Sequence, residues 1–410
     1  MAMTSGDIGT LTVLVVDDDS FQRRVIAKML TAIGVGAILS AESAQRALEV
    51  MDAPEPCVDT LVCDLDMPEM DGMEFLRRIA EKGFEGSVII LSGANSNILP
   101  SVVLMARAYG LRTLGALAKP ATTDTLRSLL LQHWTHRKTR ARDAEAVMSV
   151  EEIRAGFEGG EFEPFFQPKV YLETGRVCGA EALARWRHPV RGILPPSTFI
   201  DPIEQIGQMD SLTSAMLGKS AAWCRRWRDA GLDISISVNL SLSSLQDTRL
   251  FNRLLDIVSA HGIEPSNLVF EVTETIAMTD IAHCLETLSR LRMKGFGLSI
   301  DDFGTGFSSL QQLSRIPFTE LKIDQSFVGG ASTEPRLRSV IESSVQLAKD
   351  LGLKTVGEGV ETRDDLLCLK RAGCEIAQGY YVAKPMAGED FLSWVKEWER
   401  TALERILDRE

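Results

Sequence analysis

Histidine, paired cysteine and long apolar runs are all scarce in this chain of 410 residues. There are five histidines, and none of the seven cysteines stands in a C-x-x-C pair. Residues 1–16 lack the basic region of a secretory leader, so we expect reduced thiols and a cytoplasmic protein. One uncharged stretch, Ser87–Ala106, has the length of a membrane span, but glycine, asparagine and proline interrupt it. We therefore expect no membrane span.

Positively charged residues are also fewer than negatively charged ones. The sequence has 44 Lys and Arg against 57 Asp and Glu, a formal net charge of −13. Because affinity for nucleic acid comes mostly from neutralising phosphates, this balance argues against a nucleic-acid partner. It leaves open a small phosphate ligand, which an acidic protein can bind when it holds divalent metals.

Two stretches of alternating strand and helix patterns predict two domains joined by a linker. Over 9–135, short aliphatic runs such as Thr12–Val16 alternate with amphipathic stretches, which is typical of a small doubly wound, flavodoxin-like α/β domain. Residues 136–148 are highly charged and lack a full apolar face, so we expect a solvated helical linker. Over 149–400 the alternation resumes on a larger scale and favours a (β/α)8 barrel of the TIM type.

Five polar residues follow the ends of apolar segments in the first domain: Asp17, Asp18, Asp64, Ser92 and Lys119. Ligands bind outside the carboxyl ends of the strands in open parallel sheets, so these side chains are expected to share one rim. Three carboxylates there would repel without a divalent cation, and Mg2+ suits a shell of carboxylates and water. The lysine and the hydroxyl would stabilise an acyl phosphate, since a carboxylate can accept a phosphoryl group. A lone aspartate would be a turn former, but the ordered set predicts a phosphorylation site.

These motifs, over about residues 10–135, resemble those of response regulator receiver domains. The resemblance implies that Asp64 accepts a phosphoryl group from a sensor histidine kinase or a phosphotransfer protein. It assigns Ser92 as the switch hydroxyl and Lys119 as the phosphate-binding lysine. It also implies a Mg2+ site made by Asp17, Asp18, Asp64 and the backbone carbonyl of Asp66. Three positions before the lysine, where the family usually has an aromatic switch residue, this chain has Ala116, which puts the usual ring rotation in doubt.

A larger set of acids and amides, with one lysine, recurs at the predicted strands of the second domain: Glu181, Asn239, Glu271, Asp301, Asp302, Lys322, Glu358 and Gln378. Most stand near the downstream ends of strands, which in a barrel point to the catalytic face. One such glutamate alone would be a surface acid, but buried charges are costly unless paired or metal-bound, so the set predicts a site. Oxygen ligands without a histidine cluster favour Mg2+ or Mn2+ over zinc. The adjacent Asp301 and Asp302 could bridge two cations for phosphodiester hydrolysis.

The segments GAEALARW, EVTE, IDDFGTGF and LKID resemble the motifs of EAL-domain phosphodiesterases, over about residues 150–400. The resemblance implies hydrolysis of cyclic di-GMP to 5′-pGpG with two Mg2+ or Mn2+ ions. The implied metal ligands are Glu181, Asn239, Glu271, Asp301, Asp302 and Glu358. The implied catalytic groups are Asp302, Lys322, Glu358 and Gln378. The implied substrate contacts are Gln167, Leu183, Arg185 and Asp324. The resemblance also makes Glu274 a brace for the catalytic loop and makes a dimer through the EAL domain a reasonable expectation.

Two other functions compete with hydrolysis. A catalytically silent cyclic di-GMP receptor would signal through a protein partner, but every implied ligand position holds the expected residue. Receiver domains occur most often in DNA-binding transcription factors, but the acidic second half of this chain and the lack of a helix-turn-helix motif argue against that function. We therefore expect an enzyme.

Overall fold

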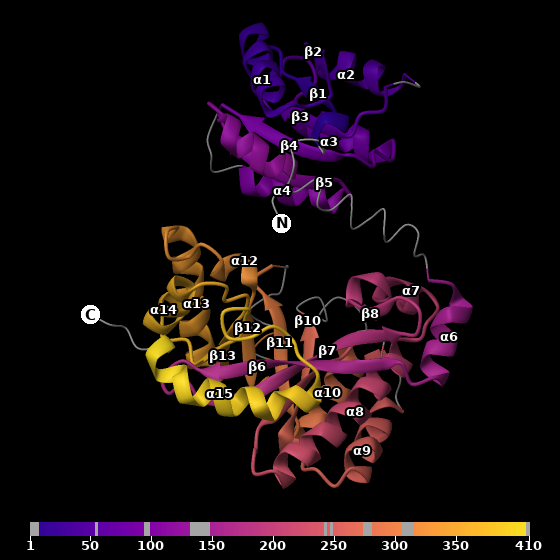
Figure 1. Cartoon of the computed structure of the whole chain (residues 1–410), viewed down its shortest axis with the longest axis vertical. Helices are drawn as coiled ribbons and strands as arrows, with labels where there is room; N and C mark the ends of the chain where they lie inside the picture. The colour runs from indigo at the N-terminus through magenta and orange to yellow at the C-terminus, as the bar shows by residue number, and fades with distance from the viewer. Residues whose placement is uncertain are drawn as a thin grey trace. The chain divides into compact units, whose positions relative to one another are not determined.

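The computed structural model describes residues 8–53, 56–93, 99–131, 148–241, 244–246, 249–273, 281–305, 313 and 315–406. The chain divides into two compact units, Met1–Ala146 and Val147–Glu410 (Figure 1). Of the linker predicted over 136–148, only Met148 is described, so its helical character stays a prediction. Within the described residues, no helix combines the length and apolarity that a membrane span requires.

The amino-terminal unit is an open parallel sheet with helices on both faces. Its strand order is β2-β1-β3-β4-β5, and every pairing is parallel. The strands are β1 (Thr12–Val16), β2 (Ala37–Ala41), β3 (Thr60–Asp64), β4 (Ser87–Ser92) and β5 (Arg112–Ala118). The helices are α1 (Ser20–Ile33), α2 (Ala44–Met51), α3 (Gly72–Glu81), α4 (Leu99–Ala108) and a segment over 123–131. This arrangement confirms the predicted flavodoxin-like fold.

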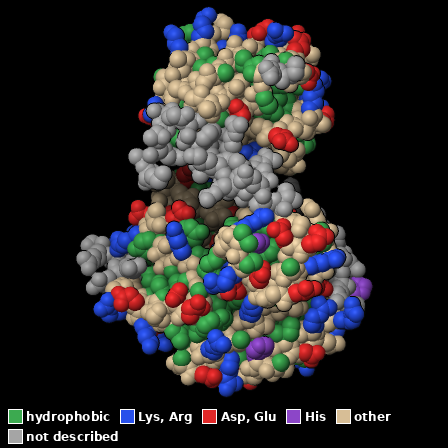
Figure 2. Space-filling view, turned by 45° about the vertical axis from the view of Figure 1, so that its right-hand side comes forward, with side chains coloured by type: hydrophobic (Ala, Val, Ile, Leu, Met, Phe, Trp, Pro, Cys, Tyr) green, Lys and Arg blue, Asp and Glu red, His purple; other side chains and the backbone are tan. Residues whose placement is uncertain are grey.

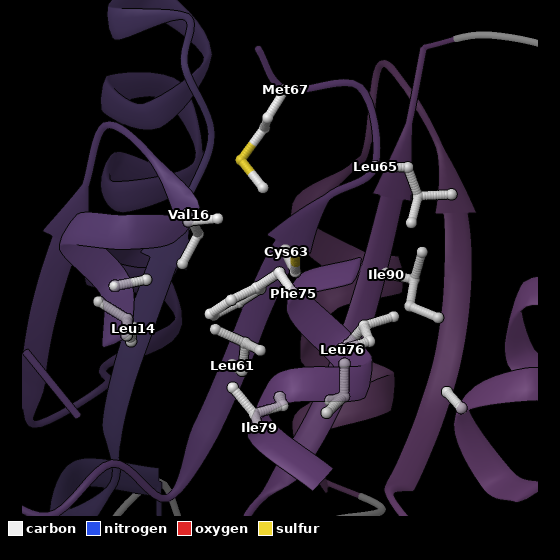
Figure 3. Close-up of a cluster of buried hydrophobic side chains, with 14 of the residues drawn as sticks. Leu14, Val16, Leu61, Cys63, Leu65, Met67, Phe75, Leu76, Ile79 and Ile90 are labelled. Atoms are coloured by element: carbon white, nitrogen blue, oxygen red, sulfur yellow. The ribbon is translucent and has the colours of Figure 1, made fainter. Parts of the chain in front are cut away.

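Successive side chains of β1 supply two separate cores. Leu14 and Val16 pack with Phe75 on one face of the sheet (Figure 3), and Val13 and Val15 belong to the cluster on the other face. Side chains of a strand alternate between faces, so a strand covered on both sides is apolar throughout. The buried polar side chains of this sheet therefore stand at or next to the strand ends.

The carboxyl-terminal unit is a closed barrel of eight strands with one irregularity. The strands run in the order β6-β14-β13-β12-β11-β10-β9-β7, and a pairing between β6 and β7 closes the ring. They are β6 (Phe162–Tyr171), β7 (Val177–His188), β9 (Ser235–Asn239), β10 (Leu268–Thr273), β11 (Gly297–Phe303), β12 (Glu320–Ile323), β13 (Lys354–Gly357) and β14 (Ile376–Ala377). The short β8 (Gly192–Leu194) pairs only with β7. The predicted barrel is confirmed, but β6 is antiparallel to both neighbours.

The reversed direction of β6 follows from its connection to β7. A parallel crossover needs a dozen or more residues, whereas only residues 172–176 join these strands. Gly175 takes a positive φ of 73° in that turn, a conformation that glycine adopts without strain. The amino-terminal half of β6 therefore lies at the same rim as the carboxyl ends of the other seven strands.

Helices surround this barrel (Figure 1). They are α6 (Val150–Glu158), α7 (Ile200–Gln205), α8 (Met209–Asp229), α9 (Leu250–Ala260), α10 (Ile281–Met293), α12 (Gln325–Val328), α13 (Pro335–Asp350), α14 (Arg363–Arg371) and α15 (Gly388–Ile406). On the face drawn in Figure 2, acidic and basic side chains are interspersed over both units.

Candidate active site and phosphoacceptor site

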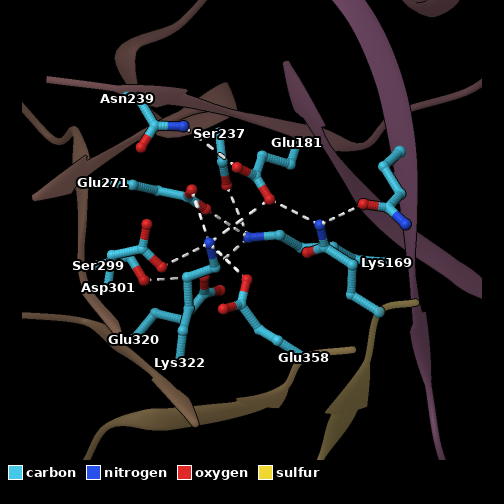
Figure 4. A network of polar contacts seen from close by, with 12 residues as sticks. Lys169, Glu181, Ser237, Asn239, Glu271, Ser299, Asp301, Glu320, Lys322 and Glu358 are labelled. Atoms are coloured by element: carbon cyan, nitrogen blue, oxygen red, sulfur yellow. Dashed lines mark hydrogen bonds and ion pairs between the residues drawn. The ribbon is translucent and has the colours of Figure 1, made fainter. Parts of the chain in front are cut away.

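Lys322 is the centre of the polar cluster in the barrel (Figure 4). Its side chain is 1% exposed, and its ammonium forms ion pairs with carboxylates from four other segments of the unit. The distances from Nζ are 3.4 Å to Glu181, 2.8 Å to Glu271, 2.8 Å to Asp301 and 2.7 Å to Glu358. The sequence analysis placed these residues on one rim, and the structure brings them together around one cation.

The amide side chains lie on the Glu181 side of the cluster. Asn239 donates to Oε1 of Glu181 at 3.1 Å, and Gln378 donates to Oε2 at 2.6 Å. Gln378 also donates to Oε1 of Gln167 at 3.1 Å, and Gln167 donates to the carbonyl of Ala383. Oε1 of Gln378 is buried and has no hydrogen-bond partner within the described residues. Since buried acceptors are rarely left unsatisfied, this oxygen is available to a water or a ligand.

A pocket of about 410 Å3 opens on the cluster. It is lined by Leu183, Asp302, Asp324 and the groups around Lys322. Asp302 follows Asp301 with a positive φ of 55°, a strained conformation for a residue that has a Cβ. Arg185 lies further along β7, where it donates to the carbonyl of Ala184 and lies over the ring of Phe165. Glu274 falls outside the described residues, so its bracing role stays a prediction.

Like charges inside the barrel perturb the ionisation of the carboxylates. Burial, together with Asp301, raises the pKa of Glu358 to about 8 despite its ion pair with Lys322. Burial and the charges of Asp301 and Asp324 raise the pKa of Asp302 to about 6. For Glu271, burial alone would raise the pKa, but two lysines outweigh it and hold the pKa at about 2. The raised pKa values of Asp302 and Glu358, which line the pocket, indicate that this part of the site has too little positive charge to balance its carboxylates.

The residues present fit divalent cations. Seven carboxylates and two lysines, Lys169 and Lys322, lie in or beside the cluster, so its net charge is −5 when every group is ionised. The carboxylates are Glu181, Glu271, Asp301, Asp302, Glu320, Asp324 and Glu358. Oxygens of Asp301, Asp302 and Glu358 lie within 4.8 Å of one another. Burying so much charge of one sign is costly without cations, and oxygen donors suit hard divalent ions.

A layer of polar residues that was not predicted from the sequence lies below this cluster: Lys169, Ser237, Ser299 and Glu320. Each is buried and stands two positions from a predicted site residue on the same strand. Period-two alternation therefore places them on the inner face, and this signal was present in the sequence. Their polarity alone did not reveal that they meet inside the barrel.

The acidic rim of the first unit is simpler. Nζ of Lys119 lies 2.7 Å from Asp17 and 2.9 Å from Asp64, and both carboxylates are buried. Burial raises the pKa of Asp64 even with Lys119 beside it. Oxygens of Asp17, Asp18 and Asp64 lie within 4.8 Å of one another, an arrangement that could hold a metal ion.

The other predicted receiver residues surround this group. Asp66 is exposed two positions beyond Asp64, and Ser92 is buried at the end of β4. The carbonyl of Ser92 accepts from the backbone N–H of Lys119 at 2.8 Å, which joins the two strand ends. Ala116 is half-buried on β5 and packs against the core with only a methyl group.

Comparison with known proteins assigns both units to families. The response regulator receiver domain matches residues 13–131, and the EAL domain matches residues 150–385. The chain is 38% identical over 388 residues to the cyclic di-GMP phosphodiesterase RocR of Pseudomonas aeruginosa, covering 94% of this chain and 98% of that protein. A solved complex of the phosphodiesterase PaMucR with c-di-GMP is 37% identical, with a TM-score of 0.57, and covers 59% of this chain and 98% of its own.

A crystal structure of an EAL domain protein from Listeria monocytogenes is also similar, with 29% identity and a TM-score of 0.54. The match covers 60% of this chain and 97% of that one. The two family matches agree with the two folds that the structure shows. The chain therefore belongs to the EAL domain family and carries an amino-terminal response regulator receiver domain.

Proposed function

We propose that this chain is a cyclic di-GMP phosphodiesterase whose receiver domain controls the hydrolysis. The observation that carries this proposal is the convergence of Glu181, Glu271, Asp301 and Glu358 on Lys322 beside an open pocket. The likeness to RocR and PaMucR supports cyclic di-GMP as the substrate. Water attacks one phosphorus, the bond to the ribose 3′ oxygen breaks, and linear 5′-pGpG leaves.

Two divalent cations, Mg2+ or Mn2+, would be held by the carboxylates of the cluster. Glu181, Asn239, Glu271 and Asp301 make the first set of ligands, and Asp301, Asp302 and Glu358 make the second. When bound, such a pair lowers the pKa of a coordinated water and offsets charge on the phosphate oxygens. The negative charge of the cluster and the proximity of the second set support this assignment.

The remaining roles fall to side chains that line the pocket or lie beside it. Glu358 accepts the proton of the attacking water, since its carboxylate lines the pocket and lies 2.7 Å from Nζ of Lys322. Lys322 stabilises negative charge that develops on the phosphate, and the open acceptor of Gln378 orients the water. The substrate contacts are Gln167, Leu183, Arg185 and Asp324.

The receiver is proposed to accept a phosphoryl group at Asp64 from a sensor histidine kinase or a phosphotransfer protein. Asp17, Asp18, Asp64 and the carbonyl of Asp66 would hold Mg2+ there, and Lys119 and Ser92 would contact the phosphoryl oxygens. The close approach of Asp17, Asp18 and Asp64 supports this assignment. A cytoplasmic location and a dimer through the EAL domain complete the proposal.

The direct test is product formation from cyclic di-GMP with Mg2+. Wild type is compared with Glu181→Ala and with Glu399→Ala, a matched change at an exposed glutamate of α15. We expect 5′-pGpG from wild type and from Glu399→Ala, and none from Glu181→Ala. Binding of cyclic di-GMP without turnover, in both the unphosphorylated and the phosphorylated wild type, would instead identify a receptor.

A further inference from the structure

Lys169 is a second buried lysine, and Figure 4 shows its ammonium beside that of Lys322. It lies on the antiparallel strand β6 and is 3% exposed. Its ammonium donates to Oγ of Ser237 at 2.8 Å, to Oε1 of Glu271 at 2.8 Å and to Oε1 of Glu320 at 2.9 Å. An ammonium group has three donors, and here each has its own acceptor on a different strand.

Glu271 is held from both sides. Its Oε1 accepts from Lys169, while its Oε2 lies 2.8 Å from Nζ of Lys322. With each oxygen bound to a separate lysine, the carboxylate group has one orientation about its last bond. Oε2 faces the other carboxylates around Lys322, and Oε1 faces the layer below.

Glu320 balances the charge of Lys169 in that lower layer. Its Oε1 also accepts from Oγ of Ser299 at 3.1 Å. The interior of a TIM-type barrel is commonly filled by layers of branched aliphatic side chains, which bury no charge. A buried ion pair contributes little stability compared with an apolar pair of similar volume. The lysine at this position therefore needs an explanation other than filling the core.

We propose that Lys169 is a positioning residue that fixes Glu271 for binding of the first metal ion, with Glu320 as its charge partner. This inference rests on the proposed two-metal function. Lys169 contacts neither the pocket nor the reacting atoms and acts only through Glu271. Partners that orient metal ligands in this way change metal affinity or activity by about 10- to 100-fold when removed.

The test is Mn2+ binding to the full-length protein without substrate, measured by calorimetry. The binding phase that Glu181→Ala abolishes is assigned to the barrel. The double variant Lys169→Met/Glu320→Gln removes one charge of each sign, so the electrostatic field at the metal site changes little while the bond to Glu271 is lost. The single variant Glu320→Gln keeps that bond and makes the site more positive.

If Lys169 positions Glu271, the double variant binds Mn2+ about 10- to 100-fold more weakly than wild type, and Glu320→Gln stays closer to wild type. KM for cyclic di-GMP at saturating Mn2+ stays near the wild-type value. A second pair, Lys169→Gln/Glu320→Gln, loses the same charges and should show the same weakening, which guards against misfolding of the first pair.

Two results would overturn the inference. Wild-type Mn2+ affinity in a folded double variant, with only a lower unfolding temperature, would make Lys169 a structural residue. Weaker binding in Glu320→Gln than in the double variant would show that charge alone sets the affinity. In both cases wild type still binds Mn2+ and hydrolyses cyclic di-GMP. A wild type that does neither would instead overturn the proposed function itself.

Discussion

The two units place a lysine among carboxylates at the carboxyl ends of parallel strands, but at different depths. Lys119 pairs with two aspartates at the edge of an open sheet, where Asp18 and Asp66 are exposed. Lys322 pairs with four carboxylates inside a closed barrel and has almost no exposed surface. The receiver leaves Asp18 and Asp66 exposed beside the buried Asp17 and Asp64, whereas the barrel gathers its carboxylates around Lys322 beside a pocket of about 410 Å3.

The two sites also differ in how much charge remains uncompensated. In the first unit one lysine forms ion pairs with two carboxylates, whereas in the second two lysines form ion pairs with five carboxylates. Electrostatic interactions are stronger where water is excluded. We therefore expect the barrel to depend more than the receiver on its central lysine and on metal ions.

The largest effect is expected from Lys322→Met. This change leaves Glu181, Asp301 and Glu358 without their cation, while Glu271 keeps Lys169. Metal-free stability should therefore fall by about 3–5 kcal/mol. Loss of a charge-stabilising donor in the site should also lower hydrolysis by about 100- to 1000-fold. Urea unfolding and 5′-pGpG formation measure the two effects. Lys354→Met, at an exposed lysine of β13, is the matched control, and equal behaviour of the two variants would contradict a central role for Lys322.

The second largest effect is expected from metal removal, which should lower the stability of the barrel more than that of the receiver. No tryptophan occurs in residues 8–131, whereas five of the six lie at 186–398, so tryptophan fluorescence follows the barrel. A ligand at 100 times its dissociation constant stabilises the folded state by about 2.7 kcal/mol per site. We therefore expect Mn2+ to raise the barrel's unfolding midpoint above its value in EDTA, and Glu181→Ala to remove most of that shift. An equal shift in Glu181→Ala would place the ions elsewhere.

The same contrast in depth explains how far the sequence could predict the sites. Residues at the ends of strands, such as Asp64 and Lys119, are found by their position after an apolar run, because parallel strands share a rim. The residues around Lys322 follow the same rule, and the structure brings them together as expected, whereas their role as metal ligands stays a prediction. The direction of β6 was not predicted, since a strand pattern is the same when read in either direction and only the short turn at 172–176 decides it.

Lys169 shows a second limit. The segment FQPK places Gln167 and Lys169 on one face of a strand, but an inward lysine is tolerable only if partners from other strands reach it. Those partners, Ser237, Glu271 and Glu320, are 68 to 151 residues away in the sequence. Closure of the barrel brings them together, and no local pattern records it.

A smaller effect is expected from Lys119→Met in the receiver. Asp17 and Asp64 lose a charged partner, but their site lies at the edge of the sheet, so the loss should be about 1–3 kcal/mol. Phosphorylation of Asp64 by a small phosphodonor should also slow, with Asp64→Asn as the unlabelled control. Radiolabel incorporation and unfolding of the isolated residues 1–131 measure both. A loss as large as that of Lys322→Met would break the contrast between the two rims.

The smallest effect is expected from Ala116→Tyr. This position has only a methyl group half-buried on β5, so we expect control of hydrolysis not to depend on the rotation of a ring there. Adding the ring at a half-exposed site should change stability by no more than about 0.5 kcal/mol and hydrolysis by no more than about twofold, with Asp64 phosphorylated or not. Ser92→Ala is the comparison, since loss of the hydroxyl should reduce the difference between the phosphorylated and unphosphorylated rates. If Ala116→Tyr instead alters that difference more than Ser92→Ala does, the surface around residue 116 carries the signal. The receiver site would then control hydrolysis in the barrel through β5.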